Sequence, residues 1–375
     1  MKTCGIIAEF NPFHNGHAKL FEYAKQELGA DHIIVVMSGD HVQRGEPALS
    51  DKYSRTEAAL RSGADLVLEL PVYSAVSSAR DFARGAVAAL INSGITDMLL
   101  FGSESGDIDR LRNSASEDPA FIKEYALRPS PNDALATGYL RALDHFSSGM
   151  KAVTLKREGA GYNDMTPVKD NASAAYIRSL LLASDETAYT YMPPFSEELL
   201  SSYTKTSRLM ELSSYSALLG YTLNLKSRED LCTYAGIWPD LADKIIKYLP
   251  EYTGFTPFIE KLKSKDLTYS HISRALLHVL LDIRNEDFAL FSKGYAYCPY
   301  LRILGIKKEA AELLHAFGKN ASVPVISRLS DAEKLLDEEA YSLLSREIKA
   351  SGIYQQCSSL TLPFRSEYSR FLIRM

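Results

Sequence analysis

Two histidines near the start of the chain, His14 and His17, are spaced as His-x-Gly-His. Imidazole nitrogens can donate hydrogen bonds to phosphate oxygens, and Gly16 lets a ligand approach the backbone closely. The pair could also ligate a metal, but neighbouring Cys, Asp or Glu residues do not complete a tetrahedral set. It could also serve only to cap a helix. Contact with the phosphates of a nucleotide is the chemistry that suits the pair best.

The segments on either side of the histidines favour the nucleotide interpretation. The apolar run over residues 4–8 predicts a buried strand that ends before Asn11-Pro12, and apolar residues recur at helical spacing from Leu20 to Leu28. The histidines therefore lie where a first strand passes into a first helix. In open parallel sheets this position is the crevice where ligands bind, beside backbone N–H groups and the positive end of a helix.

The rest of the first half alternates in the same way. Buried strands are expected over residues 33–37, 66–70, 98–101 and 152–155, and helices over residues 52–62, 77–92, 132–146 and 173–183. This alternation predicts an α/β fold with a doubly wound, Rossmann-like parallel sheet over residues 1–184. Strand signals are scarce beyond residue 185, so residues 185–375 are expected to form a mostly α-helical domain.

The loop after the second predicted strand is unusually polar. Ser38, Asp40, Gln43 and Arg44 lie in it, and in a doubly wound fold it would reach the carboxyl edge beside the histidines. We expect this loop to hold a substrate. The alternative is a solvated loop in which Arg44 pairs with Glu46.

Three other strand or helix ends carry residues that could contact a nucleotide. Gly102 could leave bare backbone for a base or ribose, although a simple tight turn needs the same glycine. Asn132 reads as a helix N-cap, and Arg157 could grip a phosphate or be an exposed charge. The helix start at Ser173, with Arg178 one turn in, suits a polyphosphate but would look the same as an ordinary capped helix.

Composition excludes several classes of protein. The chain has 375 residues with 46% hydrophobic residues, a net charge of −5 and four cysteines without paired spacing. Neither a disulfide framework, a zinc site nor any other protein-bound metal is indicated. Because it lacks a long apolar run and a signal-peptide pattern, we expect a cytoplasmic protein without a membrane partner.

Longer motifs resemble one family. The run Ala8-Glu9-Phe10-Asn11-Pro12-Phe13-His14-Asn15-Gly16-His17 resembles the opening signature of the bacterial tRNA(Met) cytidine acetate ligases. These belong to the nucleotidylyltransferase superfamily, whose His-x-Gly-His turn stabilises charge at an α-phosphate while pyrophosphate leaves. Further matching motifs are Met37-Ser38-Gly39, Gln43-Arg44-Gly45-Glu46-Pro47-Ala48, Asp81-Phe82-Ala83-Arg84-Gly85, Phe101-Gly102-Ser103-Glu104, Thr268 to Leu277 and Tyr300 to Gly305.

The resemblance implies a nucleotidylyltransferase-type fold and an ATP site. The residues that it implies for ATP binding are Ile7, Ala8, Glu9, Phe10, Asn11, Pro12, Phe13, His14, Asn15, Gly16, His17, Ala18, Lys19, Leu20, Gly102, Asn132 and Arg157. Among them His14 and His17 are expected to be catalytic. Mg²⁺ would arrive with the nucleotide.

The implied reaction has two steps. Acetate attacks ATP to give acetyl-adenylate and pyrophosphate, and N4 of the wobble cytidine of elongator tRNA(Met) then takes the acetyl group, giving N4-acetylcytidine and AMP. Asp40 and His41 are loose candidates for the group that accepts the amine proton. An alternative is a nucleotidylyltransferase acting on a small phosphate ester or mononucleotide, and another is a non-catalytic RNA-binding module.

A tRNA partner requires a surface that can bind RNA. Residues 257–308 are rich in Lys and Arg, with tyrosines between them, and Lys265, Arg274 and Arg302 are the candidates for tRNA contact. The alternative is a set of ordinary solvated helices. The sequence leaves the oligomeric state open.

Overall fold

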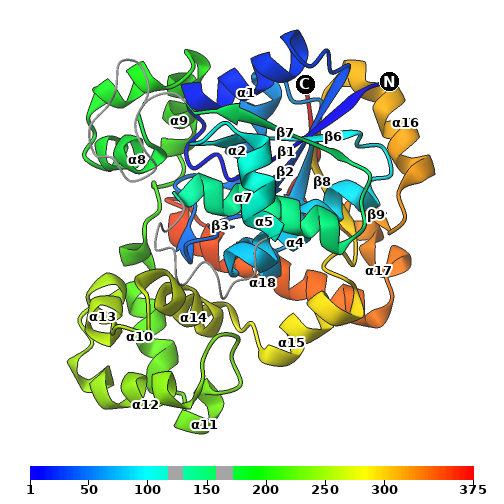
Figure 1. The fold of residues 1–375 in the computed structure, drawn as a ribbon. Helices are drawn as coiled ribbons and strands as arrows, with labels where there is room; N and C mark the ends of the chain where they lie inside the picture. Colours follow the sequence, from blue (N-terminus) through cyan, green and yellow to red (C-terminus); the bar gives the residue numbers. More distant parts are fainter. Residues whose placement is uncertain (117–129, 158–171) are drawn as a thin grey trace.

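A largely parallel sheet forms the centre of the molecule (Figure 1). The computed structural model describes residues 1–116, 130–157 and 172–375. Strands follow the order β10-β8-β5-β2-β1-β6-β7 across the sheet, and β9 pairs with β8 outside this path. The strands of the sheet are β1 (Thr3–Ala8), β2 (His32–Ser38), β5 (Leu66–Leu70), β6 (Met98–Ser103), β7 (Lys151–Lys156), β8 (Leu301–Ile306), β9 (Val325–Ile326) and β10 (Ile373–Arg374).

The strands of the first half confirm the predicted α/β topology. Strand β1 pairs in parallel with β2 on one side and β6 on the other, with Gly5 opposite Ile34 in β2 and Leu99 in β6. Strands β5 and β7 extend the parallel sheet outward. The carboxyl ends of β1, β2, β6 and β7 therefore meet at one edge, where the histidine turn begins.

Alternate residues along each strand face two separate cores. In β2, Ile33 and Val35 pack with the core under α1 (Asn15–Gln26) and α2 (Lys52–Arg61). Ile34 and Val36 point to the opposite core, under α4 (Ala79–Asn92) and α7 (Pro131–His145). Because side chains alternate with period two, a continuous apolar run is required where both faces are buried.

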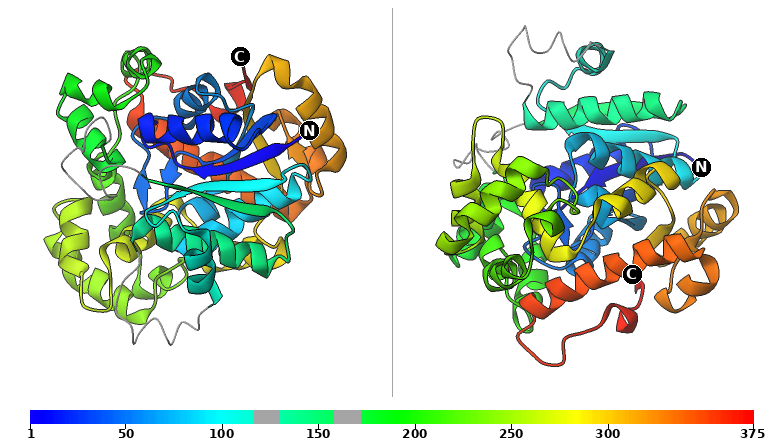
Figure 2. Two further views of the ribbon diagram at one scale, coloured as in Figure 1. Left: turned by 45° about the horizontal axis from the view of Figure 1, so that its top comes forward. Right: turned by 90° about the horizontal axis from the view of Figure 1, so that it is seen from below.

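The remaining helices group by place in the fold. Several of these helices lie outside the helical unit of residues 216–281. They are α3 (Val72–Ala75), α5 (Ile108–Ser116), α8 (Ala174–Leu182), α9 (Phe195–Thr204), α15 (Asn285–Ala289), α16 (Ala311–Asn320), α17 (Ala332–Leu335) and α18 (Glu338–Ser358). The helical unit consists of α10 (Ser216–Asn224), α11 (Arg228–Leu231), α12 (Pro239–Tyr248), α13 (Phe255–Leu262) and α14 (Tyr269–Leu281). Figures 1 and 2 show this unit at one end of the molecule, beside a short hairpin of β3 (His41–Val42) and β4 (Glu46–Pro47).

The domain prediction needs correction in the second half. Strands β8, β9 and β10 come from the segment expected to be a separate helical domain, yet they belong to the N-terminal sheet. Strand β8 pairs antiparallel with β5, so Gly305 lies opposite Val67. A boundary at residues 184 and 185 therefore does not divide the chain into two independent domains, although the helical unit itself is present.

Candidate active site

The two histidines form the first turn of α1. His14 is the N-cap residue, and its Nδ1 accepts a hydrogen bond from the backbone N–H of Gly16 at 3.0 Å. Nδ1 of His17 accepts one from the backbone N–H of His14 at 3.2 Å. The rings stack with centroids 3.8 Å apart. The histidines do cap the helix, as the alternative interpretation has it, but they use only Nδ1 for this purpose. Nε2 of each ring is left for other contacts.

Burial keeps both rings neutral. It is the main cause that lowers the pKa of His14 to about 3, and the cations Arg157 and Arg178 lower it further. Burial also lowers the pKa of His17 well below its usual value, followed by the effects of His14 and Arg157. Since Nδ1 accepts a backbone hydrogen bond in each ring, the single proton of each neutral imidazole is on Nε2. The turn therefore presents two uncharged N–H donors.

Aromatic packing fixes the position of the His17 ring. Phe10 has a left-handed backbone conformation, with φ of 48°, and its ring meets that of His17 edge-on at 5.0 Å. Phe13 approaches the same ring at 5.5 Å. Gly16 leaves room for the other histidine, because a Cβ at this position would lie 2.9 Å from Cε1 of His14.

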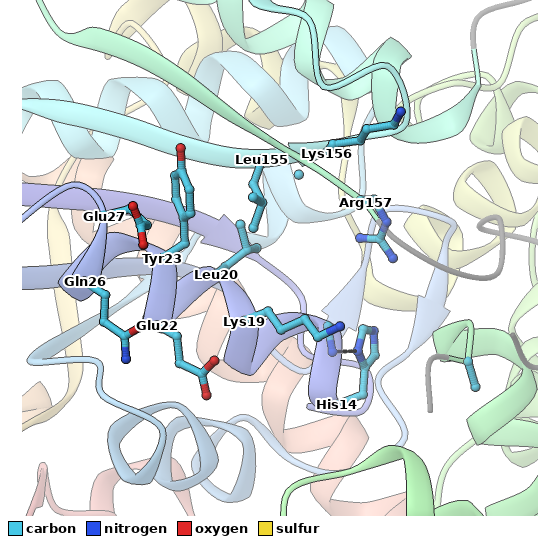
Figure 3. Close-up of a pocket in the computed structure, with 13 residues that line it drawn as sticks. His14, Lys19, Leu20, Glu22, Tyr23, Gln26, Glu27, Leu155, Lys156 and Arg157 are labelled. Carbon is cyan, nitrogen blue, oxygen red and sulfur yellow. Dashed lines mark hydrogen bonds between the residues drawn. The ribbon is translucent and has the colours of Figure 1, made fainter. Parts of the chain in front are cut away.

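Two adjoining cavities meet at the histidine turn. The larger, of about 300 Å³, lies between α1 and the end of β7, where Leu20 and Tyr23 face Leu155 (Figure 3). The smaller, of about 130 Å³, lies beside the ends of β1 and β6. His14, Leu20, Gly102 and Arg157 line both cavities. A volume of this order is typical of sites for small ligands.

Arg157 brings a positive charge to this junction. It follows β7, and its side chain extends toward His14 and Lys19 in Figure 3. Gly102 makes this path available, because a Cβ there would lie 3.2 Å from Cγ of Arg157. Gly102, Arg157 and His14 therefore lie together where the two cavities join.

Asn132 lines the smaller cavity and is not an N-cap. Helix α7 begins one residue earlier, after Ser130, and Nδ2 of Asn132 donates to Oε1 of Glu104 at 2.6 Å. The Glu104 carboxylate also accepts from the backbone N–H of Asp133 and the hydroxyl of Ser130. Glu104 thus fixes both the start of α7 and the amide of Asn132.

The remaining lining of the smaller cavity combines charge and hydrogen-bonding groups. Nη1 of Arg178 donates to the carbonyl of Asn11 at 2.8 Å, which ties α8 to the histidine turn. Glu9 accepts from the backbone N–H of Gln43 at 2.8 Å, and burial raises the pKa of Glu9. Ser173 caps α8 and lines the same cavity.

The predicted substrate loop divides into two parts. Gln43 lines the smaller cavity, but Ser38 and Asp40 are buried in packing outside the lining of both cavities. Asp40 accepts from the backbone N–H of Lys52 at 2.8 Å, and burial raises its pKa to about 6 against the charge of Lys52. Arg44, at the tip of the hairpin, also lies outside both linings.

Not every residue of the predicted ATP segment points into the cavities. Pro12 and Phe13 line a separate small pocket beside α9, and Nδ2 of Asn15 donates to the carbonyl of Thr190. Gly16 and Lys19 line the larger cavity. The other members that line the smaller cavity are Ile7, Ala8, Glu9, Phe10, Asn11 and His17.

The candidates for tRNA contact have different environments. Lys265 is exposed between α13 and α14, and Arg274 is partly buried on α14. Arg302 is 5% exposed and forms ion pairs with Glu69 at 2.8 Å and Glu367 at 2.7 Å. A guanidinium enclosed in this way cannot reach RNA, so the prediction for Arg302 is wrong.

Sequence reasoning found only the first part of one side of α1. Gly16, Lys19 and Leu20 were predicted and line the larger cavity, but Glu22, Tyr23, Gln26 and Glu27 of the same face were missed. These residues recur every three or four positions, which is the spacing that could have revealed them. In the part of the chain that the structure describes, no helix has both the length and the apolar character needed to cross a membrane.

The doubly wound sheet and the histidine turn at its carboxyl edge define a nucleotidyl transferase. The family model described as HIGH Nucleotidyl Transferase matches residues 1–126 and 120–367. The tRNA(Met) cytidine acetate ligase of Thermoanaerobacter sp. (strain X514) is 33% identical, with 94% of this chain and 95% of the relative covered. The ligase of Fervidobacterium nodosum is 34% identical, with 90% and 86% covered. The chain belongs to the tRNA(Met) cytidine acetate ligase family, as its motifs predicted.

Solved structures agree with this assignment. The chain resembles the crystal structure of Thermotoga maritima TmcAL in its apo form with a TM-score of 0.92, at 26% identity and 100% coverage of both chains. The structure of the same protein bound with alpha-thio ATP gives a TM-score of 0.90, also at 26% identity and full coverage.

Proposed function

We propose that this chain activates acetate with ATP and transfers the acetyl group to N4 of the wobble cytidine of elongator tRNA(Met). The observation on which this rests is the junction of the two cavities at His14, Gly102 and Arg157. A nucleotide lying across the junction would place its phosphates beside imidazole and guanidinium groups. The alpha-thio ATP in the T. maritima structure supports a nucleotide site in this fold.

In the first step, an oxygen of acetate attacks the α-phosphorus of ATP. A bond to acetate forms, the bond to pyrophosphate breaks, and acetyl-adenylate results. Negative charge grows on the phosphate oxygens as this happens. The Nε2–H groups of His14 and His17 and the guanidinium of Arg157 would stabilise that charge, because they are already oriented and need no proton transfer.

In the second step, the cytidine amine attacks the carbonyl carbon of acetyl-adenylate. The bond from this carbon to the phosphate oxygen breaks, AMP leaves with the electron pair, and the amine releases a proton to water. Gln43 and Arg178 of the smaller cavity would orient acetate and cytidine, since such positioning supplies much of the rate of a two-substrate reaction. Asp40 and His41 lie outside both linings, so neither is retained as proton acceptor.

We also propose that Mg²⁺ arrives with the nucleotide. In residues 1–116, 130–157 and 172–375, the His, Cys, Asp and Glu side chains include no group of three that could hold a metal ion. Phosphate oxygens and water would then be the ligands, as is common for Mg²⁺ in nucleotide sites.

The test is nucleoside mass spectrometry after incubation with ATP, Mg²⁺, labelled acetate and elongator tRNA(Met). We expect ATP-dependent label in N4-acetylcytidine with the wild type and none with His17→Ala. If AMP and pyrophosphate form in the presence of acetate but no label enters the RNA, the enzyme activates acetate as an adenylate. Cytidine is then excluded as the acceptor of the acetyl group. Transfer of AMP to a small phosphate ester instead would favour the alternative nucleotidylyltransferase.

A further inference from the structure

The chain contains a single tryptophan, and it lies on the surface of the helical unit. Trp238 is 52% exposed at the N-cap position of α12. One face of its indole stacks on His271 of α14, with ring centroids 4.7 Å apart and planes at 29°. The indole is thus held in place by a ring contact while about half of its surface is exposed to solvent.

His271 holds this indole rigidly. Its Nε2 lies 3.0 Å from the carbonyl oxygen of Gly236, in the loop that leads to Trp238. Burial, followed by the charge of Arg274, lowers the pKa of His271, so the ring is neutral near pH 7 and its Nε2–H donates to that carbonyl. The ring pair is therefore fixed to both α14 and the start of α12.

Helix α14 connects the ring pair to the smaller cavity. Arg274 lies one turn beyond His271, and its Nη1 donates to the carbonyl oxygen of Gln43 at 3.3 Å. On the same helix, Oγ of Ser273 donates to the carbonyl of Gly45 at 2.8 Å. Gly45, with φ of 79°, is required here because a Cβ would collide with the backbone of Arg274. Gln43 lines the smaller cavity. Trp238, His271 and Arg274 therefore form a row of side chains that leads to the lining of this cavity.

We infer that Trp238, backed by His271, is a stacking platform for an unpaired nucleobase of the RNA that places its cytidine in the smaller cavity. The inference rests on the proposed function. An exposed indole with a guanidinium further along the same row suits single-stranded RNA, whose bases stack on aromatic rings while cations contact the backbone. The hairpin that α14 supports then connects the platform to the site of acetyl transfer.

Because Trp238 is the single tryptophan, its fluorescence reports directly on this contact. The wild-type enzyme is titrated with elongator tRNA(Met), while anisotropy of the labelled RNA measures binding independently. We expect the RNA to quench Trp238 emission and to protect it from acrylamide. Unchanged emission and unchanged acrylamide quenching, at RNA concentrations where anisotropy shows saturation, would overturn the inference.

Substitutions provide a second readout. For Trp238→Ala we expect the KM for tRNA to rise roughly tenfold, because stacking of one base on an aromatic side chain is worth about that factor or more. Acetate-dependent exchange of pyrophosphate into ATP, measured without RNA, should stay at the wild-type rate, and Trp238→Phe should lose less tRNA affinity than Trp238→Ala. Phe371→Ala, at an exposed aromatic before β10, is the matched control and should change neither value.

Two outcomes separate this inference from the proposed function. If the wild type makes N4-acetylcytidine and Trp238→Ala has an unchanged KM for tRNA, the inference that Trp238 is a stacking platform is wrong, whereas the proposed ligase activity stands. If the wild type neither binds tRNA nor acetylates it, the proposed function fails and the platform fails with it.

Discussion

Each histidine of the turn uses one nitrogen for structure and leaves the other for chemistry. Nδ1 of His14 caps α1 by accepting from Gly16, so Nε2 carries the proton and can donate to a phosphate oxygen. A helix N-terminus supplies further positive potential for an anion. Capping and the proposed catalysis would thus be two functions of one ring, and a suitable substitution separates them.

His14→Asn should keep the cap and lose the catalytic donor, because an asparagine side-chain oxygen can accept the Gly16 N–H. His14→Ala removes both groups. We expect both variants to form acetyl-adenylate roughly 10²- to 10³-fold more slowly, as when a transition-state donor is lost. Thermal unfolding should show loss of stability mainly for His14→Ala, since an N-cap is worth about 1 kcal/mol. Wild-type adenylation by His14→Asn would contradict the role of Nε2.

The lowered pKa values of the histidines predict a pH dependence with a definite sign. The pKa of His14 is about 3 in the folded protein against an ordinary value of 6.5, so between these values the unfolded chain binds protons that the folded chain does not. The free energy of unfolding should therefore fall as the pH decreases from about 6.5 towards 3. His41, also near 3, contributes in the same direction.

Acid stability is measured by urea unfolding at a series of pH values. His14→Asn should show a shallower loss of stability between pH 6.5 and the acid limit of folding than the wild type. The rate of adenylate formation should show no histidine titration near pH 6.5 while the enzyme is folded. An inflection there that disappears in His14→Asn would mean that the ring titrates normally.

The glycines show what could be predicted from sequence at this scale. Gly16 and Gly102 were predicted to be needed, and the structure confirms that neither position has free space for a side chain. The predicted reason was close approach of a ligand to the backbone. Both glycines line the larger cavity, and their nearest side-chain neighbours are the His14 ring and the Arg157 side chain. The contact of Gly16 with His14 is local, whereas that of Gly102 with Arg157 depends on tertiary packing that local sequence does not encode.

At the scale of elements, the strands and helices that were predicted in the first half agree with the structure to within one or two residues at most ends, whereas α3, α5 and the hairpin of β3 and β4 were not predicted. Apolar runs and helical periodicity are local signals, so β2, β5 and α2 could be recognised directly. Strand β8 belongs to the same sheet only because it pairs antiparallel with β5, more than half the chain away. Hydrophobic pattern does not specify such a partner.

The start of α7 is an element whose position matters for the site. Glu104 holds Asn132 and the backbone of Asp133, so we expect Glu104 to act as a positioning residue through Asn132. Glu104→Gln should raise the KM for ATP about tenfold, the effect of losing one hydrogen bond of about 1.4 kcal/mol to a charged group. Asn132→Ala should do the same.

The double variant tests whether the two residues act as one unit. If Glu104 works through Asn132, Glu104→Gln combined with Asn132→Ala should raise the KM for ATP no further than Asn132→Ala alone. Additive effects of the two substitutions would show that Glu104 acts elsewhere, for example on the stability of α7.

At the scale of the whole molecule, a buried group of charges fastens the last part of the chain to the sheet. Lys52 of α2 lies 2.7 Å from Glu69 of β5 and 2.9 Å from Glu367, near the C-terminus. Arg302 of β8 pairs with the same two carboxylates. Arg302 looked like a surface cation from sequence because its partners lie far away along the chain. A third carboxylate, Asp40, lies 3.9 Å from Lys52 in the same buried group. Because water is excluded there, each of these charges depends on the others.

Glu367→Gln should therefore destabilise the protein strongly. Burial alone would raise the pKa of Glu367, but Lys52 and Arg302 lower it to about 2, so the carboxylate is charged at neutral pH. Its removal takes away a carboxylate that contacts both Lys52, at 2.9 Å, and Arg302, at 2.7 Å, and breaking a buried ion pair in this way costs about 3 to 5 kcal/mol. Urea unfolding at pH 7 measures this loss, and Asp243→Asn, which breaks the exposed pair with Arg228, is the control with little expected change. An equally small change for Glu367→Gln would mean that water enters the group and that the C-terminal segment is fastened by apolar packing alone.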